Sequence, residues 1–297
     1  MEPEKNNTHF KILLGDDRSE HALAALALLE DLPLPAGTDV TVFRAFSPTQ
    51  ATDVILMEDA LNQTCNRLKG KGLNTHPELL LGVPTVKFLK HAEEQNPDLI
   101  IIGAKGLRAT TGILVGGVAQ QVVEYALCPV LVVRAPYHGL HKLMLVTDGS
   151  ESSQHALHYL GRLPLPEETR LWVLHVLPPP PIPMLYMQTT LGSTPVAFQD
   201  LGEAAALAAQ EELEGQALLD NALAALRAAG KPAKGLLKRG DAASEIMAAA
   251  REMEIDLLVS GSRGHSPIRS WMMGSVSRKL VHYSGCSVLV VRQPKTQ

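Results

Sequence analysis

The stretch DLIIIGAKG at Asp98–Gly106 recurs later in the same chain as DLLVSGSRG at Asp256–Gly264. Each copy joins a short apolar run to a glycine-containing turn, which is the pattern of a buried strand and the loop that follows it. The two stretches lie 158 positions apart, and the same separation relates CPVLVVR at 128–134 to CSVLVVR at 286–292. The chain therefore contains an internal repeat, and that repeat decides the fold.

Toward the N-terminus the separation between the copies is smaller. LALLEDLPLP at 26–35 matches LHYLGRLPLP at 157–166, which is 131 positions further on. The second copy thus carries 158 − 131 = 27 additional residues, placed after its second strand beside the segment PPPPIP at 178–183. We expect residues 178–202 to form a mobile loop that is extended at its proline end. Whether this loop closes over a site or reaches a neighbouring molecule stays open.

Both copies alternate short β-branched runs with longer helical segments, the latter including Ala51–Leu68 and Leu201–Ala229. This alternation predicts βαβ units with right-handed crossovers and a parallel sheet covered on both faces. The expected strands are 11–15, 38–45, 78–81, 98–102 and 130–133 in the first copy, and 143–147, 169–176, 233–238, 256–260 and 288–291 in the second.

The fold class is accordingly α/β, with two doubly wound, Rossmann-like domains of five parallel strands each. We place the domains at residues 1–135 and 141–297. The linker at 135–141 is short, so the two domains are expected to pack against each other as an internal pseudo-dimer. Association of two chains into a homodimer stays open.

Composition excludes several function classes. The chain has 297 residues and a formal charge of −4, so its charge balance does not favour binding to nucleic acid or to an anionic membrane. No apolar run approaches the roughly 18 residues of a membrane helix. Cys65, Cys128 and Cys286 form no CxxC pair, and the start of the chain does not resemble a secretory signal. We therefore expect a cytoplasmic protein.

The segment GSRGHSPIRSWMMGS at 261–275 predicts an anion site. Gly261 and Gly264 permit positive φ and a close approach of the backbone, so their turn can expose N–H groups to an anion. Gly274 and Ser275 open a helix whose first N–H groups attract a phosphate. The contributing residues are expected to be Gly261, Arg263, Gly264, His265, Gly274, Ser275, Val276 and Ser277.

Charge and neighbouring strands support the same site. Between Gly261 and Lys279 there are four basic side chains and no carboxylate, in a chain whose net charge is negative. Asp148 follows the first strand of the second copy, where a carboxylate can accept a hydrogen bond from a ribose hydroxyl. Val176 ends the next strand and could present its backbone to an adenine edge.

The spacing Gly-x2-Gly-x9-Gly-Ser resembles the phosphate loop of the universal stress protein family, whose fold is similar to that of adenine nucleotide alpha hydrolases. The segments DGSE at 148–151 and CSVLVVR at 286–292 resemble two further signatures of that family. The resemblance covers nearly the whole chain, twice. It implies binding of ATP or AMP and a role in stress survival. It also implies that the domains pair through their last strands. Mg²⁺ carried in by the nucleotide is considered only for the alternative of slow hydrolysis.

The first copy departs from this pattern. Gly117 stands where the hydroxyl is expected, and Arg18 replaces the small residue after the aspartate. Loss of one hydrogen bond to a charged group costs about 1.5–3 kcal/mol, so we expect weak nucleotide binding here or none. The corresponding positions are Asp17, Ala45, Gly103, Lys105, Gly106, Gly116 and Gly117.

Other interpretations stay open at this stage. The glycines could be simple turn residues, and Asp148 could cap the following helix as well as bind a ligand. No spacing typical of a metal site and no catalytic set is evident. A slow Mg-ATP hydrolase and an interaction protein with a vestigial site are therefore the alternatives to a nucleotide-binding regulator. The sequence does not identify a protein partner.

Overall fold

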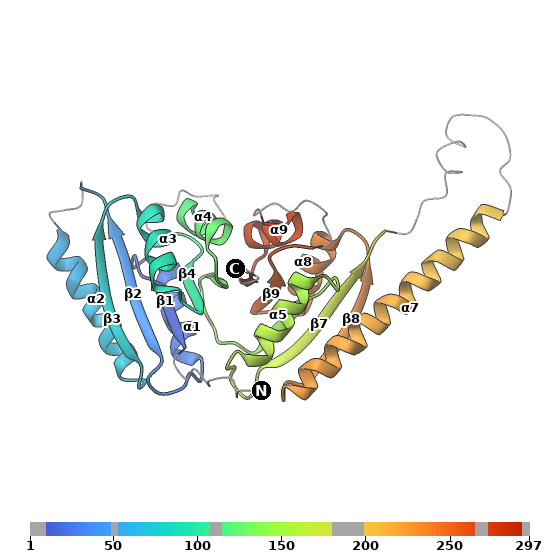
Figure 1. Ribbon diagram of the computed structural model, residues 1–297, viewed down its shortest axis with the longest axis horizontal. Coiled ribbons are helices and arrows are strands. Elements are labelled where there is room, and N and C mark those ends of the chain that lie inside the picture. The colour runs from blue at the N-terminus through green and yellow to red at the C-terminus, as the bar shows by residue number, and fades with distance from the viewer. Residues whose placement is uncertain (1–9, 49–52, 107–114, 180–198, 265–272, 293–297) are drawn as a thin grey trace, which may run out of the picture.

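The computed structural model describes residues 10–48, 53–106, 115–179, 199–264 and 273–292, with side chains from residue 205 onward in the fourth range. The described strands form one ten-stranded sheet in the order β3-β2-β1-β4-β5-β10-β9-β6-β7-β8. Figure 1 shows this sheet running through two similar halves that lie side by side. The predicted α/β class with two doubly wound repeats is confirmed.

The N-terminal half alternates strands and helices from its first strand to its last. Its elements are β1 (Lys11–Gly15), α1 (Glu20–Asp31), β2 (Asp39–Phe46), α2 (Val54–Lys69), β3 (Asn74–Leu81), α3 (Pro84–Gln95), β4 (Leu99–Gly103), α4 (Gly117–Tyr125) and β5 (Val130–Val133). All strand pairs within this half are parallel, so their carboxyl ends meet at one edge of the sheet.

The C-terminal half repeats this order. Its elements are β6 (Lys142–Val146), α5 (Glu151–Arg162), β7 (Arg170–Leu177), α7 (Gln199–Ala228), β8 (Ala233–Arg239), α8 (Ala242–Glu252), β9 (Leu257–Gly261), α9 (Ser275–Tyr283) and β10 (Ser287–Val291). Of the predicted loop at 178–202, residues 180–198 lie outside the described part of the chain, and α7 begins at Gln199. Leu219, Ala222 and Leu226 of α7 are buried, so this end of the helix covers the sheet as expected.

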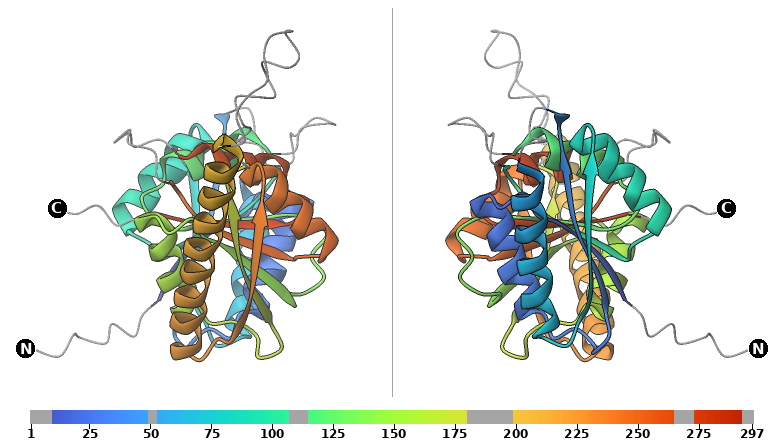
Figure 2. Two further views of the ribbon diagram at one scale, coloured as in Figure 1. Left: turned by 90° about the vertical axis from the view of Figure 1, so that its right-hand side faces the viewer. Right: turned by 90° about the vertical axis from the view of Figure 1, so that its left-hand side faces the viewer.

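Pairing of the last strands joins the two halves, as the sequence resemblance implied. Strands β5 and β10 run antiparallel with Leu131 opposite Leu289. These two leucines occupy equivalent positions of the repeat, 158 residues apart, so a local two-fold axis passes between them. Helices cover both faces of the continuous sheet (Figure 2), and the leucine, isoleucine and valine side chains of the strands are buried beneath them.

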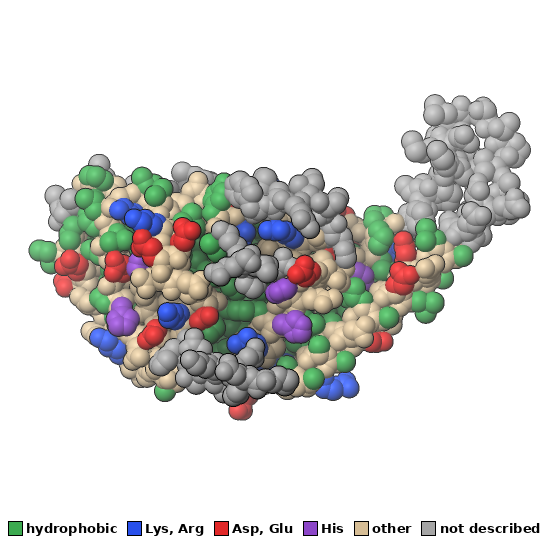
Figure 3. Space-filling view, in the orientation of Figure 1, with side chains coloured by type: hydrophobic (Ala, Val, Ile, Leu, Met, Phe, Trp, Pro, Cys, Tyr) green, Lys and Arg blue, Asp and Glu red, His purple; other side chains and the backbone are tan. Residues whose placement is uncertain are grey.

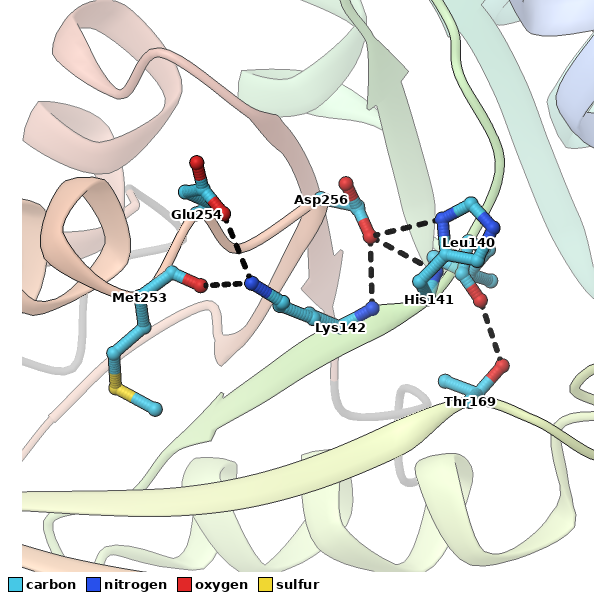
Figure 4. A network of polar contacts seen from close by, with 7 residues as sticks. All are labelled: Leu140, His141, Lys142, Thr169, Met253, Glu254 and Asp256. Carbon is cyan, nitrogen blue, oxygen red and sulfur yellow. Dashed lines mark hydrogen bonds and ion pairs between the residues drawn. The ribbon is translucent and has the colours of Figure 1, made fainter.

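The repeated aspartate of the opening motif fixes the start of each half. The Asp256 carboxylate accepts hydrogen bonds from the N–H groups of Lys142 at 2.7 Å and His141 at 2.9 Å, where β6 begins. The Lys142 ammonium group donates to the Met253 carbonyl at 2.9 Å, so the turn after α8 is held as well (Figure 4). In the N-terminal half Asp98 accepts equivalently from the Lys11 N–H at 2.8 Å.

Candidate functional site

The glycine-spaced segment lies at the carboxyl edge of the sheet in the C-terminal half. Gly261 is the last residue of β9, so the strand ends one residue later than the predicted Ser260, and Gly274 is the N-cap of α9. The N–H of Gly274 donates to the Ser262 carbonyl at 2.8 Å, which brings the two ends of the segment together. His265 lies outside the described residues, so its predicted contact with a phosphate stays a prediction.

Some of the N–H groups expected to face an anion are used within the fold. The Ser262 N–H donates to the Val291 carbonyl at 2.9 Å, and the Arg263 N–H donates to Ser152 Oγ at 3.1 Å. Within the described ranges, no group accepts from the N–H groups of Gly264, Ser275, Val276 and Ser277. The first intrahelical bond of α9 runs from the Arg278 N–H to the Gly274 carbonyl. These four donors form the cluster that can bind an anion.

The glycines are required for close packing rather than for positive φ. Neither Gly261 nor Gly264 has positive φ, which corrects the first of the two sequence-based reasons. A Cβ atom on Gly261 would lie 2.6 Å from the Ser152 carbonyl oxygen of α5. A Cβ atom on Gly264 would lie 2.6 Å from Asp148 Oδ2, so this glycine lets the loop pass directly beside the carboxylate.

Asp148 shapes the turn that leads into α5. One of its oxygens, Oδ1, accepts from the Ser150 N–H at 3.0 Å, while Oδ2 faces Gly264. The N-cap of α5 is Ser150, whose hydroxyl accepts from the Ser153 N–H. The N-cap of α5 is thus Ser150, and the interpretation of Asp148 as that cap is wrong. Its contact with a ribose stays a prediction.

The two serines of α9 differ in what their hydroxyl groups can do. Ser275 is exposed at the first turn of the helix. Ser277 is 4% exposed, and its hydroxyl donates to the Gly261 carbonyl at 2.7 Å. The Ser277 hydroxyl therefore uses its proton in a hydrogen bond to the Gly261 carbonyl and does not donate it to a ligand. Val176 is the penultimate residue of β7 and lies at the same edge of the sheet, and its contact with adenine stays a prediction.

The N-terminal half reproduces this backbone. Gly116 caps α4 and donates to the Ala104 carbonyl at 2.7 Å, as Gly274 does to Ser262. A Cβ atom on Gly106 would lie 2.5 Å from Asp17 Oδ2, and one on Gly103 would lie 2.7 Å from the backbone of α1. The two halves thus present the same main-chain frame, including the predicted positions Asp17, Gly103, Gly106 and Gly116.

A cavity of about 320 Å³ opens at this edge of the N-terminal half. The ends of β1, β2 and β4 and the starts of α3 and α4 surround it. Its lining includes all seven of the predicted positions, namely Asp17, Ala45, Gly103, Lys105, Gly106, Gly116 and Gly117. It also includes Phe43, Pro84, Phe88 and Ile102, which the sequence analysis did not identify. Periodicity cannot distinguish such residues from core positions, because a residue of a cavity wall has the same apolar character as one of the core.

The electrostatic surroundings of the two loops differ in detail. Burial lowers the pKa of Arg292, and the positive charge of nearby Arg263 lowers it further. Burial likewise lowers the pKa of His21, with a second contribution from Lys105. Arg18 adopts φ 62°, whereas its counterpart Gly149 has φ 79°. An arginine therefore occupies a left-handed position that glycine adopts without strain.

Neither a metal cluster nor a membrane span is found in the part of the chain that the structure describes. No group of three or more His, Cys, Asp or Glu side chains is placed to hold a metal ion there. Among the same residues, no helix combines the length and apolar character needed to cross a bilayer. The three cysteines are unpaired with one another.

A sequence profile of the universal stress protein family matches residues 9–134 and again residues 139–292. The chain belongs to the universal stress protein family. The two matches confirm the tandem arrangement that the internal repeat predicted. Universal stress protein YxiE of Bacillus subtilis strain 168 is 31% identical over 152 residues, covering 51% of this chain and 99% of that protein. The "universal stress protein in QAH/OAS sulfhydrylase 3'region" of Thermus aquaticus is 33% identical over 135 residues, covering 41% of this chain and 97% of its own.

A solved structure extends the similarity to the whole tandem universal stress protein. The universal stress protein from Archaeoglobus fulgidus DSM 4304 aligns with a TM-score of 0.64 and 19% identity, covering 98% of this chain and all of its own. At this identity the alignment shows the fold alone. It agrees with the two joined halves seen here.

Proposed function

We propose that this universal stress protein is a regulator of the stress response that binds an adenine nucleotide, ATP or AMP, mainly in its C-terminal half. The observation that carries the proposal is the cluster of four N–H donors at Gly264, Ser275, Val276 and Ser277. N–H groups at a helix start attract phosphate through both hydrogen bonding and the helix dipole. The Ser275 hydroxyl and the Arg263 guanidinium are exposed and would add to that attraction.

The comparison between the halves supports the preference for the C-terminal site. The N-terminal half has the same backbone but lacks the hydroxyl, because Gly117 replaces Ser275. One hydrogen bond to a charged group contributes about 1.5–3 kcal/mol, which corresponds to roughly a tenfold to hundredfold change in affinity. We also propose that the two domains span residues 1–135 and 141–297, and that the protein is cytoplasmic.

The nucleotide is also suited to supply any divalent cation. No described cluster of carboxylates or imidazoles offers an independent metal site. Mg²⁺ would therefore be held chiefly by the phosphates of the nucleotide, which is a common arrangement. The residues of this chain would bind the anionic tail, orient the ribose beside Asp148 and leave the γ-phosphate at the loop.

A matched pair of variants tests the proposal. Ser275→Asp places a carboxylate over the amides of α9, and Gly117→Asp does the same at α4. Ser275 is exposed, and a Cβ atom on Gly117 would meet nothing within 4 Å, so both variants should fold. An acidic residue in the first helical turn also favours the helix. Gly274→Asp is a less clean variant, because its Cβ atom would lie 3.3 Å from Arg263 Cα.

Titration calorimetry with ATP and with AMP should find one strong site in the unaltered protein. We expect Ser275→Asp to weaken that site at least about tenfold, and Gly117→Asp to leave it unchanged. Mass spectrometry of ligand released from protein purified without added nucleotide should identify the adenylate. Unchanged affinity in Ser275→Asp, or loss of the strong site in Gly117→Asp, would refute the assignment. Turnover of Mg-ATP at about one per second or faster would instead indicate an enzyme.

A further inference from the structure

We propose that the N-terminal cavity binds a small aromatic molecule carrying a single anionic group, and that it discriminates against a triphosphate. This inference goes beyond the nucleotide proposal and stands without it. It rests on a comparison of equivalent positions in the two halves, which share a backbone frame and differ in their side chains.

The floor of the cavity is apolar where the other half is polar. Ile102 and Ala119 line it, and their counterparts in the C-terminal half are Ser260 and Ser277. Those two serines are hydrogen bonded to each other at 3.2 Å and to the Gly261 carbonyl. In the N-terminal half this network of hydroxyl groups is replaced by aliphatic surface. A polyphosphate gains nothing from such a surface, whereas an apolar ligand is stabilised by it.

Two aromatic rings complete this apolar wall. Phe43 and Phe88 meet edge to face, with ring centroids 5.1 Å apart and planes inclined by 82°. Both line the cavity, and their counterparts are Leu174 and Ile246. Phenyl rings favour offset or edge-to-face contact with a further aromatic group. A volume of about 320 Å³ lies near the lower end of the range found for small-molecule sites.

The first turn of α3, which supplies Pro84 to the cavity lining, carries exposed apolar side chains at a cost in local helix stability. Val83 is the N-cap of α3 and is 64% exposed, and Val86 is 61% exposed. Their counterparts are Asp241 and Ser244, where the aspartate caps α8 by accepting from the Ser244 N–H at 3.0 Å. The two N-cap positions have nearly the same backbone, with φ −69° and ψ 119° at Val83 and φ −68° and ψ 118° at Asp241.

A valine at an N-cap is unfavourable, because it cannot accept a hydrogen bond from the first helical turn. Nothing in the backbone of α3 prevents an aspartate there. An exposed apolar side chain that replaces a cap beside a cavity is the kind of local exception found at functional sites. Leu81, at the end of β3 and equivalent to Arg239, is a further exposed apolar side chain in this half, at 53%. Figure 3 shows hydrophobic side chains at the surface of the N-terminal half, at the left, scattered among charged and other side chains.

A second set of lining residues, the polar wall, supplies the polar contacts. Lys105 and the N–H groups of Gly106 and Gly117 can bind one anionic group. Asp16, which stands where the other half has Thr147, adds a second carboxylate to the lining. It is 4% exposed, and its oxygens accept from the Arg18 N–H at 2.9 Å and the Thr64 hydroxyl at 2.6 Å, so it contributes through its charge. Two carboxylates at this wall disfavour the accumulated charge of a triphosphate. A ligand with one anionic group and an aromatic body satisfies both walls.

The probe for this class is 8-anilinonaphthalene-1-sulfonate, an aromatic monoanion whose fluorescence rises in apolar surroundings. We expect the full-length protein to bind it at one site, and saturating ATP not to displace it. Ile102→Ser should weaken binding about tenfold, since it removes several buried methyl and methylene contacts. Val83→Asp combined with Val86→Ser should weaken it about threefold. This second variant restores a helix cap at exposed positions, so it will fold even if Ile102→Ser does not.

The matched control removes exposed apolar side chains of α2, a helix that contributes no residue to the cavity lining, whereas α3 contributes Pro84 and Phe88. Ile55 and Leu56 of α2 are 74% and 69% exposed, and Ile55→Ser with Leu56→Ser should leave probe binding unchanged. The proposal is overturned if this control weakens binding as much as Val83→Asp with Val86→Ser does. It is equally overturned if neither cavity variant changes the affinity, or if ATP displaces the probe mole for mole.

Discussion

Arg134 and Arg292 provide the sharpest prediction about how the two halves of this protein hold together. They are equivalent residues of the repeat, and each reaches across the two-fold axis to the C-terminal end of a helix in the other half. Arg134 Nη2 donates to the Val281 carbonyl of α9 at 2.8 Å and, more distantly, to the His282 carbonyl at 3.5 Å. Burial lowers the pKa of both guanidinium groups. They nevertheless stay charged at any pH relevant to folding.

Arg292 makes the stronger pair of contacts. Its Nη2 donates to the Val123 carbonyl at 2.7 Å and also to the Glu124 carbonyl. A hydrogen bond from a charged donor contributes about 1.5–3 kcal/mol, and a cation at a helix C-terminus adds about 0.3–1 kcal/mol. Desolvation of the buried guanidinium offsets part of this gain. We therefore expect Arg292→Met to lower the free energy of unfolding by about 2–4 kcal/mol, and Arg134→Met by about 1.5–3 kcal/mol.

Urea denaturation followed by circular dichroism measures both changes. The control is Arg67→Met, because Arg67 also makes a two-pronged contact, with Glu30, but is 52% exposed and pairs within one half. Exposed ion pairs contribute about 0–1 kcal/mol, so this variant should shift the midpoint little. If Arg292→Met shifted the midpoint no more than Arg67→Met, the cross-axis contacts would not stabilise the joined halves and the reasoning would be wrong.

Three further predictions concern single positions. Gly261→Ala should destabilise the protein by about 1–3 kcal/mol, since its Cβ atom would collide with the backbone of α5. Gly117→Ala has open space around its Cβ atom and should stabilise the protein by about 0.5–1 kcal/mol. Thermal melts measure both changes. Arg18→Gly should raise the urea midpoint, because relief of a left-handed arginine, about 1–2 kcal/mol, exceeds the added chain entropy of glycine; a lower midpoint would contradict this. Burial lowers the pKa of His21, whose Nδ1 accepts from the Ala135 N–H at 2.8 Å. The contribution of His21 to stability should therefore be full above its ordinary pKa of 6.5 and fall as the pH drops below it. In urea titrations between pH 7.5 and 5.5, His21→Gln should lose less stability than the unaltered protein.

Much of the fold could be predicted because the same order of strands and helices occurs twice in the sequence. The matched strands at 98–102 and 256–260 needed only their boundaries corrected, by one residue. Gly103 and Gly261 extend β4 and β9 because they pair with Val133 and Val291 of the neighbouring strands. That pairing depends on residues about thirty positions away, so no local reading of the sequence could include it.

Strand β3 was underestimated for a different reason. Only 78–81 was predicted, yet the strand begins at Asn74 and pairs with β2 along its whole length. It is an edge strand, so several of its first residues are exposed and polar and give no apolar alternation. Pro77 within it further weakened the signal, although proline is tolerated at a sheet edge.

The candidate site could be predicted only in its main-chain component. Spaced glycines and a following helix indicate where N–H groups gather, because that information is local. The reason for each glycine was not local: Gly264 passes beside Asp148, which lies more than a hundred residues earlier. The cavity wall depends in the same way on Phe88 of α3 meeting Phe43 of β2. Such meetings arise from the order of strands in the sheet, and a strand or helix pattern alone does not contain them.

The repeat nevertheless allows a stricter argument than a single domain would. The two halves make nearly the same backbone contacts at three places: Gly103 and Gly261, Gly106 and Gly264, and the N-caps of α4 and α9. The main chain alone therefore cannot distinguish the ligands of the two halves. Any difference in ligand must then come from side chains that differ at equivalent positions. Exchanging Gly117 and Ser275 should therefore move phosphate affinity between the halves without moving the backbone. A protein in which both exchanged sites kept their original affinities would show that the described side chains do not select the ligand.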